Sequence, residues 1–227
     1  MQGFSEIITT GDGSKTLYNP TLNEYYHSKH GALQEAMHVF IRAGLDFFNR
    51  NRSDNTPIKI LEIGLGTGLN ALLSLKYAEE HHVTIYYTGI EPFPISKEQL
   101  KDVEYPDIDS LNKYSDFWKL MHQKSCSDYE AIGSRFYLKK ITKPVLEATI
   151  AETYDLIYYD AFGPRAQPEM WEKAIFEKLY KRHAAGGIFT TYCVTGNLRR
   201  TLKDLGYSVE KIPGPPGKRE MTRATKP

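Results

Sequence analysis

Apolar positions recur at two spacings along the chain, and together they predict strands that alternate with helices. Short apolar runs at 58–63, 84–90, 136–138, 154–159 and 188–194 have the length and residue types of strands. The run at 154–159 is almost continuously apolar, which is typical of a strand buried on both faces. Three- and four-residue spacing predicts helices at 69–78, 146–152, 171–184 and 197–205, the third ended by Gly186 and Gly187. This alternation predicts an α/β fold with a mostly parallel, doubly wound sheet.

The two ends of the chain depart from this alternation. Residues 207–212 and 220–225 flank a proline- and glycine-rich turn at 213–217 without a helix between them. They predict an antiparallel hairpin at the edge of the sheet and seven strands in all. Near the N-terminus we expect a hairpin at 6–18 and an amphipathic helix at 31–49. The predicted organisation is an N-terminal hairpin-plus-helix extension over 1–50 and a main domain over 51–227.

Composition excludes several classes of protein. The 227 residues are 41% hydrophobic and 25% charged, which argues against disorder, and the mean hydropathy is −0.48. No apolar run approaches the roughly 18 residues that a membrane helix needs, and the N-terminus lacks the features of a secretory signal. The cysteines Cys126 and Cys193 are too few and too far apart for a disulfide scaffold or a thiolate zinc site. We therefore expect a cytoplasmic protein without membrane or metal.

Charge is unevenly distributed along the chain. The net charge is +1, but the segment from Thr195 to the end has eight basic and three acidic residues, a net +5, and the rest carries −4. This segment is either a solvated helix with a basic tail or a surface for an anionic partner.

A glycine-rich motif follows the first strand of the main domain. Gly64, Gly66 and Gly68 stand where the strand turns into a helix, and glycines there let the backbone turn sharply and approach a ligand. Glu91 ends the next strand, where a carboxylate can accept hydrogen bonds from both hydroxyls of a ribose. The motif and Glu91 together predict a nucleotide-type cofactor, and the alternative is a tight turn without a ligand.

The spacing and charge of the motif decide which cofactor is expected. The third glycine comes one residue earlier than in the dinucleotide motif, and Glu62 lies two residues before the first glycine. A carboxylate there opposes a pyrophosphate but suits the cationic amino-acid end of S-adenosylmethionine. We therefore expect S-adenosylmethionine.

Asp160 follows the buried strand 154–159 and precedes Ala-Phe-Gly-Pro. Ligands in open α/β sheets bind at the carboxyl ends of strands, so Asp160 is a candidate functional residue. The alternative is that it only caps the turn before Pro164.

These motifs together resemble the class I S-adenosylmethionine methyltransferases, and more narrowly the MnmC-like transfer-RNA methyltransferases. The resemblance covers nearly the whole chain and rests on residues 26–32 (YHSKHGA), Glu35, 38–40 (HVF), 62–70 (EIGLGTGLN), 160–164 (DAFGP), 168–171 (PEMW), 186–187 (GG) and 217–221 (GKREM). It implies a Rossmann-like fold and methylation of the aminomethyl group of 5-aminomethyl-2-thiouridine at the wobble position of the transfer-RNA anticodon loop. In bifunctional members a flavin-dependent oxidase domain follows, so we expect a stand-alone methyltransferase without FAD or metal, and a separate flavin oxidase partner upstream in the pathway.

The resemblance also assigns site residues. Asp160 is the catalytic candidate, which orients the amine and accepts its proton. The expected cofactor-binding residues are Glu62, Gly64, Gly66, Gly68, Asn70, Glu91 and Asp160. The expected substrate-binding residues are Tyr26, Ser28, His30, Phe162, Tyr192, Lys218 and Arg219, with the aromatic rings stacking on bases and the last two contacting phosphates. Core packing or surface exposure without a role is the alternative for each aromatic ring and for His30.

Adenine recognition departs from the pattern of related enzymes, which commonly carry an acidic residue after the third strand. That place reads Lys139-Lys140-Ile141-Thr142 here. Backbone atoms are therefore expected to bind the adenine amino group.

Two other functions remain open from the sequence. One is a class I transferase that acts on a small polyamine-type amine. The other is an RNA-binding module with a vestigial cofactor pocket.

Overall fold

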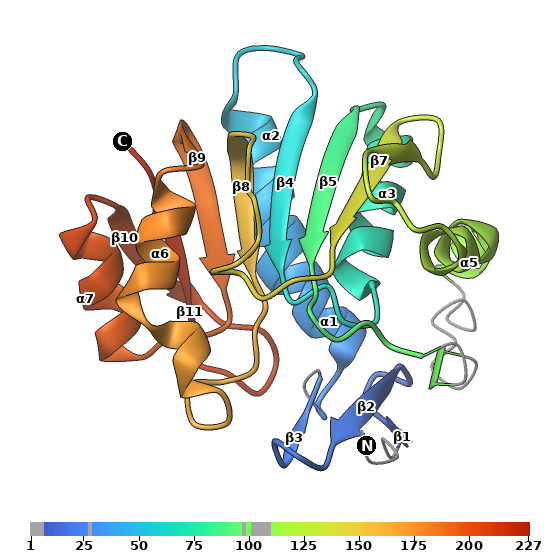
Figure 1. Ribbon diagram of the computed structural model, residues 1–227, viewed down its shortest axis with the longest axis horizontal. Helices are drawn as coiled ribbons and strands as arrows, with labels where there is room; N and C mark the ends of the chain where they lie inside the picture. Colours follow the sequence, from blue (N-terminus) through green and yellow to red (C-terminus); the bar gives the residue numbers. More distant parts are fainter. Residues whose placement is uncertain (1–6, 27–28, 97–98, 101–109) are drawn as a thin grey trace.

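The computed structural model describes residues 7–26, 29–96, 99–100 and 110–227. Within these ranges no helix is both long and apolar enough to span a bilayer. The predicted α/β fold is confirmed, since strands and helices alternate through most of the chain (Figure 1).

The main sheet has the order β10-β11-β9-β8-β4-β5-β7-β6. Its strands are β4 (Ile58–Ile63), β5 (Ile85–Ile90), β6 (Glu130–Ala131), β7 (Phe136–Ile141), β8 (Tyr154–Tyr159), β9 (His183–Thr191), β10 (Ser208–Pro213) and β11 (Glu220–Thr225). The five strands from β9 to β7 are parallel, and the hairpin β10–β11 joins β9 in the antiparallel sense at the predicted edge. The structure adds the two-residue strand β6 to the seven predicted strands.

The sheet reverses its direction of winding at β4, which pairs with β5 on one side and with β8 on the other. The segments that follow β4 and β8 diverge at this point, and a crevice opens beside their carboxyl ends. The glycine motif follows β4, Glu91 follows β5 and Asp160 follows β8. The topology therefore brings three separately predicted features to one edge of the sheet.

Helices cover both faces of the sheet. One face packs against the helical segment 32–51, which consists of α1 (Ala32–Ala36), the π-helix η1 (Met37–Asp46) and α2 (Phe47–Asn51). The helices α3 (Leu69–His81) and α5 (Ser115–Gln123) belong to the same core. The other face packs against α6 (Lys173–Tyr180) and α7 (Gly196–Asp204), which are drawn to the left of β9 in Figure 1. Two short 3-10 helices, η3 (Asn112–Tyr114) and η4 (Pro168–Trp171), precede α5 and α6.

A small antiparallel sheet lies at the carboxyl ends of the main strands (Figure 1). It contains β1 (Ile7–Thr9), β2 (Lys15–Asn19) and β3 (Glu24–Tyr25). The turn between β1 and β2 also caps the first helix, because Asp12 Oδ2 accepts the Gln34 amide at 2.9 Å and Ser14 Oγ accepts the Ala32 amide at 3.2 Å. These hydrogen bonds tie the small sheet to the helical segment 32–51.

The predicted helix at 146–152 is wrong. Residues 145–149 form a turn in which the amides of Glu147 and Ala148 both donate to Pro144 O. The Lys178 ammonium donates to the carbonyl oxygens of Leu146 and Ala148, both at 2.7 Å. A side chain from α6 therefore takes the acceptors that a helix would use.

The predicted helix at 171–184 is too long. Its helical part ends at Tyr180, and β9 begins already at His183, whose ring nitrogen Nδ1 lies 2.8 Å from the Tyr207 hydroxyl. Gly186 and Gly187 lie within β9 rather than at the end of a helix. The register between β8 and β9 shifts here, from Tyr154 opposite His183 to Leu156 opposite Ile188, so the glycines belong to an irregularity in the strand.

The helical segment 32–51 shares its core with the main sheet, and a matched pair of leucines tests this packing. Leu45 in η1 is 0% exposed, whereas Leu146 is 50% exposed. We expect Leu45→Ala to lower the free energy of unfolding by about 2–5 kcal/mol in urea denaturation, with one cooperative transition. Leu146→Ala should change it by less than about 1 kcal/mol. A separate early transition in Leu45→Ala would show instead that residues 1–50 unfold as a unit of their own.

Candidate active site

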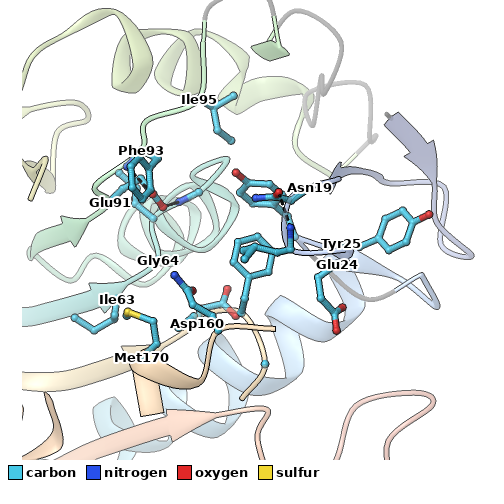
Figure 2. A pocket seen from close by; sticks show the side chains of 18 of the residues that line it. Asn19, Glu24, Tyr25, Ile63, Gly64, Glu91, Phe93, Ile95, Asp160 and Met170 are labelled. Atoms are coloured by element: carbon cyan, nitrogen blue, oxygen red, sulfur yellow. Dashed lines mark hydrogen bonds between the residues drawn. The ribbon is translucent and has the colours of Figure 1, made fainter. Parts of the chain in front are cut away.

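A cavity of about 810 Å³ opens at the carboxyl ends of the central strands, between the main sheet and the segment 19–26 of the small sheet. Figure 2 shows Gly64 and Asp160 between the segment of Glu91 and Phe93 on one side and Glu24 and Tyr25 on the other. Nine of the residues predicted from the sequence line this cavity: Tyr26, Gly64, Gly66, Asn70, Glu91, Asp160, Phe162, Tyr192 and Lys218.

The glycine loop needs its glycines for conformation and for space. Gly64 has φ +90°, and a Cβ there would lie 2.5 Å from the Asp160 carbonyl oxygen. Gly66 has φ +49° and exposes its backbone to the cavity. Gly68 has φ +76° and begins α3, but it faces His122 rather than the cavity. The close contact of Gly64 with the end of β8 fixes the distance between the loop and Asp160.

Glu91 is positioned by backbone donors on both sides. Its Oε2 accepts the Gly66 amide at 3.1 Å and its Oε1 accepts the Phe93 amide at 3.0 Å. Burial raises the pKa of this carboxyl, and the two hydrogen bonds oppose that shift. Each oxygen retains a lone pair, so the carboxylate can accept two further hydrogen bonds from hydroxyl groups of a ligand in the cavity.

The Asn70 side chain joins two acidic groups. Its Nδ2 donates to Glu62 Oε1 and to Asp160 Oδ2, both at 2.8 Å. Glu62 is fully buried on β4 and does not line the cavity, so it lies behind Asn70. In this geometry Glu62 is connected to the cavity through Asn70, and its role in cofactor binding stays a prediction.

Both carboxyl groups prefer the protonated form more than usual. Burial, together with the charge of Asp160, raises the pKa of Glu62 well above its ordinary value. Burial and the charge of Glu35 raise the pKa of Asp160 to about 7, although the Asn70 hydrogen bond and the Lys218 charge act in the opposite direction. Asp160 thus titrates near neutral pH, which is the range in which a carboxylate exchanges protons most effectively in catalysis.

Aromatic and charged side chains form the opposite wall. The rings of Tyr26 and Phe162 meet edge to face, with centroids 5.0 Å apart. Tyr192 donates its hydroxyl to Ala161 O at 2.8 Å, and the Lys218 ammonium lies 4.1 Å from the centroid of its ring. The same ammonium lies 2.5 Å from Glu35 Oε1.

Comparison with known proteins decides the family. A family model described as S-adenosyl-L-methionine-dependent methyltransferase matches residues 109–227, more than half of the chain. The chain belongs to this family. It is an S-adenosylmethionine-dependent methyltransferase, and the predicted class I fold and the MnmC-like resemblance are confirmed.

Individual relatives extend the similarity over almost the whole methyltransferase. A protein of Leptospira interrogans named tRNA 5-methylaminomethyl-2-thiouridine biosynthesis bifunctional protein MnmC is 31% identical and aligns with 94% of this chain. A protein of the same name from Burkholderia thailandensis is 30% identical and aligns with 95%. Each alignment covers 34% of the relative, so the chain spans about a third of the length of these curated relatives. The crystal structure of MnmC2 from Aquifex aeolicus superposes with a TM-score of 0.78 and 25% identity, covering 99% of this chain and 71% of that one.

The residues of the cavity fit S-adenosylmethionine. Glu91 offers carboxylate oxygens at the end of β5, where a ribose is expected, and the glycine loop presents backbone without side chains. Asn70 Oδ1 has no hydrogen-bond partner among the described residues, so this buried acceptor can accept a hydrogen bond from a ligand ammonium. Among the same residues no group of three or more histidine, cysteine or acidic side chains could hold a metal ion.

Lys139 and Lys140, the basic residues after the third predicted strand, do not line the cavity. The Lys140 ammonium donates to the carbonyl oxygens of Met121 and Lys124, at 2.8 and 2.5 Å, and Lys139 pairs with Asp128 at 3.3 Å. Pro144 and Val145 line the cavity near this strand. Binding of adenine by backbone atoms in this region stays a prediction.

Two predicted substrate residues, His30 and Arg219, do not line the cavity in the described structure. Ser28 lies outside the described residues. His30 is exposed and packs against Gly217, where a Cβ would lie 2.6 Å from the imidazole ring. Arg219 is exposed on the turn between β10 and β11.

Sequence reasoning missed the support of the glycine loop by α5. Trp118 Nε1 donates to Thr67 O at 3.1 Å, and His122 Nε2 lies 3.1 Å from the same oxygen. Burial lowers the pKa of His122 to about 4, so the neutral ring donates through Nε2. Neither contact follows from spacing along the chain, because α5 lies about fifty residues after the loop.

Removal of the Glu91 carboxylate should weaken cofactor binding specifically. We expect Glu91→Ala to raise the Kd for S-adenosylmethionine about 100-fold, because two ribose acceptors and the ordering of Gly66 are lost together. Isothermal titration calorimetry measures this change. Glu169→Ala is the matched control, since Glu169 is an exposed carboxylate that lines the same cavity, and it should leave the Kd within about threefold. Equal affinities of the two variants would contradict the predicted role of Glu91.

The raised pKa of Asp160 should make the protein less stable as the pH rises. Between the unfolded value near 4 and the folded value of about 7, the folded state binds more protons, so the free energy of unfolding falls with pH. We expect Asp160→Asn to raise this free energy by about 1–3 kcal/mol at pH 8 and much less at pH 4, in urea denaturation without ligand. Asp116→Asn, at a side chain that is 99% exposed, should change it at neither pH. A variant no more stable than the wild type at pH 8 would contradict the raised pKa.

Proposed function

We propose that the protein transfers a methyl group from S-adenosylmethionine to the aminomethyl group of 5-aminomethyl-2-thiouridine at the wobble position of transfer RNA. The product would be 5-methylaminomethyl-2-thiouridine. Support comes from the similarity over 94% of the chain to proteins named for the biosynthesis of this nucleoside, and over 99% to the structure of MnmC2.

The position and pKa of Asp160 carry the chemical part of the proposal. S-adenosylmethionine supplies an electrophilic methyl group on a sulfonium. An aliphatic amine has a pKa of roughly 10, so at neutral pH it is almost entirely protonated and cannot attack. Asp160 lines the cavity beside the glycine loop, and its pKa of about 7 lets it be ionised and receive a proton there. Asn70 holds the carboxyl through Oδ2 and thereby orients it toward the substrate.

The aromatic wall suits a base that is turned out of an anticodon loop. Tyr26 and Phe162 line the cavity next to Asp160 and can stack on such a base. Burial and the charge of Glu91 raise the pKa of Tyr26 to about 12, so the ring stays neutral at any physiological pH. A partner with flavin oxidase activity would act before this step, and a protein that modifies transfer RNA would work in the cytoplasm.

Methyl transfer to defined RNA tests the proposal. Transfer RNA that carries 5-aminomethyl-2-thiouridine is incubated with labelled S-adenosylmethionine. The RNA is then digested, and the nucleosides are separated and identified by mass spectrometry. A single added methyl on the aminomethyl group is expected. Transfer to a polyamine and not to the RNA would favour the small-amine transferase, and absence of cofactor binding would favour an RNA-binding module.

The pH profile of this reaction should report the ionisation of the Asp160 carboxyl. We expect kcat/KM to rise with pH through about 7, because the carboxylate must be ionised to receive the proton of the amine. Asp160→Ala should lower kcat by about 10²- to 10⁴-fold and should retain cofactor binding. Turnover close to that of the wild type would contradict the assignment of Asp160 as the base.

A further inference from the structure

A second buried carboxylate lines the cavity and has no part in the mechanism above. Glu35 lies on α1 and is 9% exposed. Its Oε1 pairs with Lys218, but its Oε2 is buried without a hydrogen-bond partner among the described residues. Buried carboxylate oxygens are rarely left unpaired, so this atom indicates a place for a donor that a ligand brings.

The surroundings of the Lys218 ammonium show what kind of group binds there. The ammonium lies 2.5 Å from the Glu35 carboxylate and 4.1 Å from the centroid of the Tyr192 ring. A carboxylate combined with the face of an aromatic ring is a typical environment for a bound organic ammonium. Both Glu35 and Tyr192 line the cavity, so an ammonium of a substrate can reach the same place.

The Lys218 side chain is placed so that it can move away from Glu35 and Tyr192. Lys218 lies on the turn between β10 and β11, and its side chain is 34% exposed. Its neighbours Gly217 and Arg219 are exposed as well. The long lysine side chain has several rotatable bonds, so the ammonium can turn toward solvent or an RNA phosphate without disturbing the core.

We propose that Glu35 and the face of Tyr192 form the subsite that receives the amino group of the substrate as an ammonium, and that Lys218 fills this subsite until the substrate displaces it. This inference rests on the proposed function for the identity of the substrate. One cation replaces another, so Glu35 keeps a partner throughout the exchange. A neutral substituent cannot make this exchange, because it would leave Glu35 buried without a cation.

The subsite and the base line the same cavity. Glu35, Tyr192 and Asp160 all belong to its lining, and the Tyr192 hydroxyl donates at 2.8 Å to the carbonyl oxygen of Ala161, the residue that follows Asp160. The charges of Glu35 and Lys218 act on the pKa of Asp160 in opposite directions, as expected for side chains that share this cavity. The bound ammonium can therefore give one proton to the Asp160 carboxylate. The N–H bond breaks, an O–H bond forms, and the electron pair stays on nitrogen as the nucleophile.

Chemical rescue tests the subsite without RNA or turnover. Lys218→Ala leaves Glu35 unpaired, and we expect a lower Tm than in the wild type. Propylammonium chloride at 0.1 M should then raise the Tm of this variant by about 2–4 °C relative to sodium chloride at the same concentration. The double variant Glu35→Gln with Lys218→Ala should show no such rise. The control Lys59→Ala removes an ion-paired lysine elsewhere, 3.0 Å from Glu152, and should not be rescued. Equal responses of the single and double variants would overturn the subsite.

Binding of modified RNA tests whether the substrate uses the subsite. Anticodon stem-loops with 5-aminomethyluridine or with 5-hydroxymethyluridine, its uncharged counterpart, are compared by Kd. We expect the wild type to prefer the aminomethyl form about tenfold or more, and Glu35→Gln to remove this preference with unchanged affinity for S-adenosylmethionine. Glu24→Gln, an exposed carboxylate in the same cavity, should keep the preference. Lys218→Ala should prefer the aminomethyl form by a larger factor than the wild type does, because the competing ammonium is gone and any lost phosphate contact weakens both RNAs alike.

The two experiments separate the inference from the proposed function. A preference that survives Glu35→Gln, or a preference that shrinks in Lys218→Ala, would overturn the displacement of Lys218 by the substrate. Successful rescue by propylammonium in a protein that does not methylate the RNA would support the ammonium subsite and reject the proposed substrate.

Discussion

The side-chain amide of Asn70 holds two buried carboxyl groups together at the point where β4 and β8 end. Two carboxylates this close repel each other strongly where water is excluded, and one amide with two N–H donors can satisfy an oxygen of each. Asn70 reaches both because α3 begins at Leu69, immediately before it, with Gly68 at the N-cap position. The left-handed conformations of Gly64, Gly66 and Gly68 set that starting point. The turn of the loop, the direction of α3 and the position of Asp160 thus depend on one hydrogen-bonded unit.

This unit contributes one carboxyl group, Asp160, to a cavity whose lining is acidic. Acidic side chains in the lining outnumber basic ones, with Glu24, Glu35, Glu91, Asp160 and Glu169 against Lys29 and Lys218. Such a lining favours cations, and the sulfonium donor and the protonated amine of the proposed reaction are both cations. They cannot react in that state, because the nitrogen has no free electron pair. A carboxylate with a pKa near 7 resolves this conflict, since it attracts the ammonium and can also take its proton.

The sequence predicted the parts of the site that follow strands. Gly64, Glu91 and Asp160 each come directly after an apolar run, and parallel strands bring their carboxyl ends to one edge, so pattern and topology suffice to place them together. The turn at 145–149 could not be predicted in this way, because the Lys178 side chain decides its conformation from about thirty residues away. The hydrogen bond from Trp118 to Thr67 could not be predicted either, because it joins two segments that are far apart in the sequence and share no periodic pattern.

The small sheet explains how a distant part of the chain reaches the site. The turn between β1 and β2 supplies the side chains that cap α1, so the helix begins at Ala32 and Glu35 falls in its first turn. This position buries Glu35 against the cavity, where the turn between β10 and β11 brings Lys218 to it across 183 positions of sequence. The same small sheet continues into the segment 19–26, which forms a wall of the cavity. Residues before the first strand of the main sheet therefore help to build the side of the cavity that we propose for the substrate, while the strands of the sheet build the side that we propose for the cofactor. The two sides meet at Asp160, which the Asn70 amide holds from the cofactor side and on which the charges of Glu35 and Lys218 act from the substrate side.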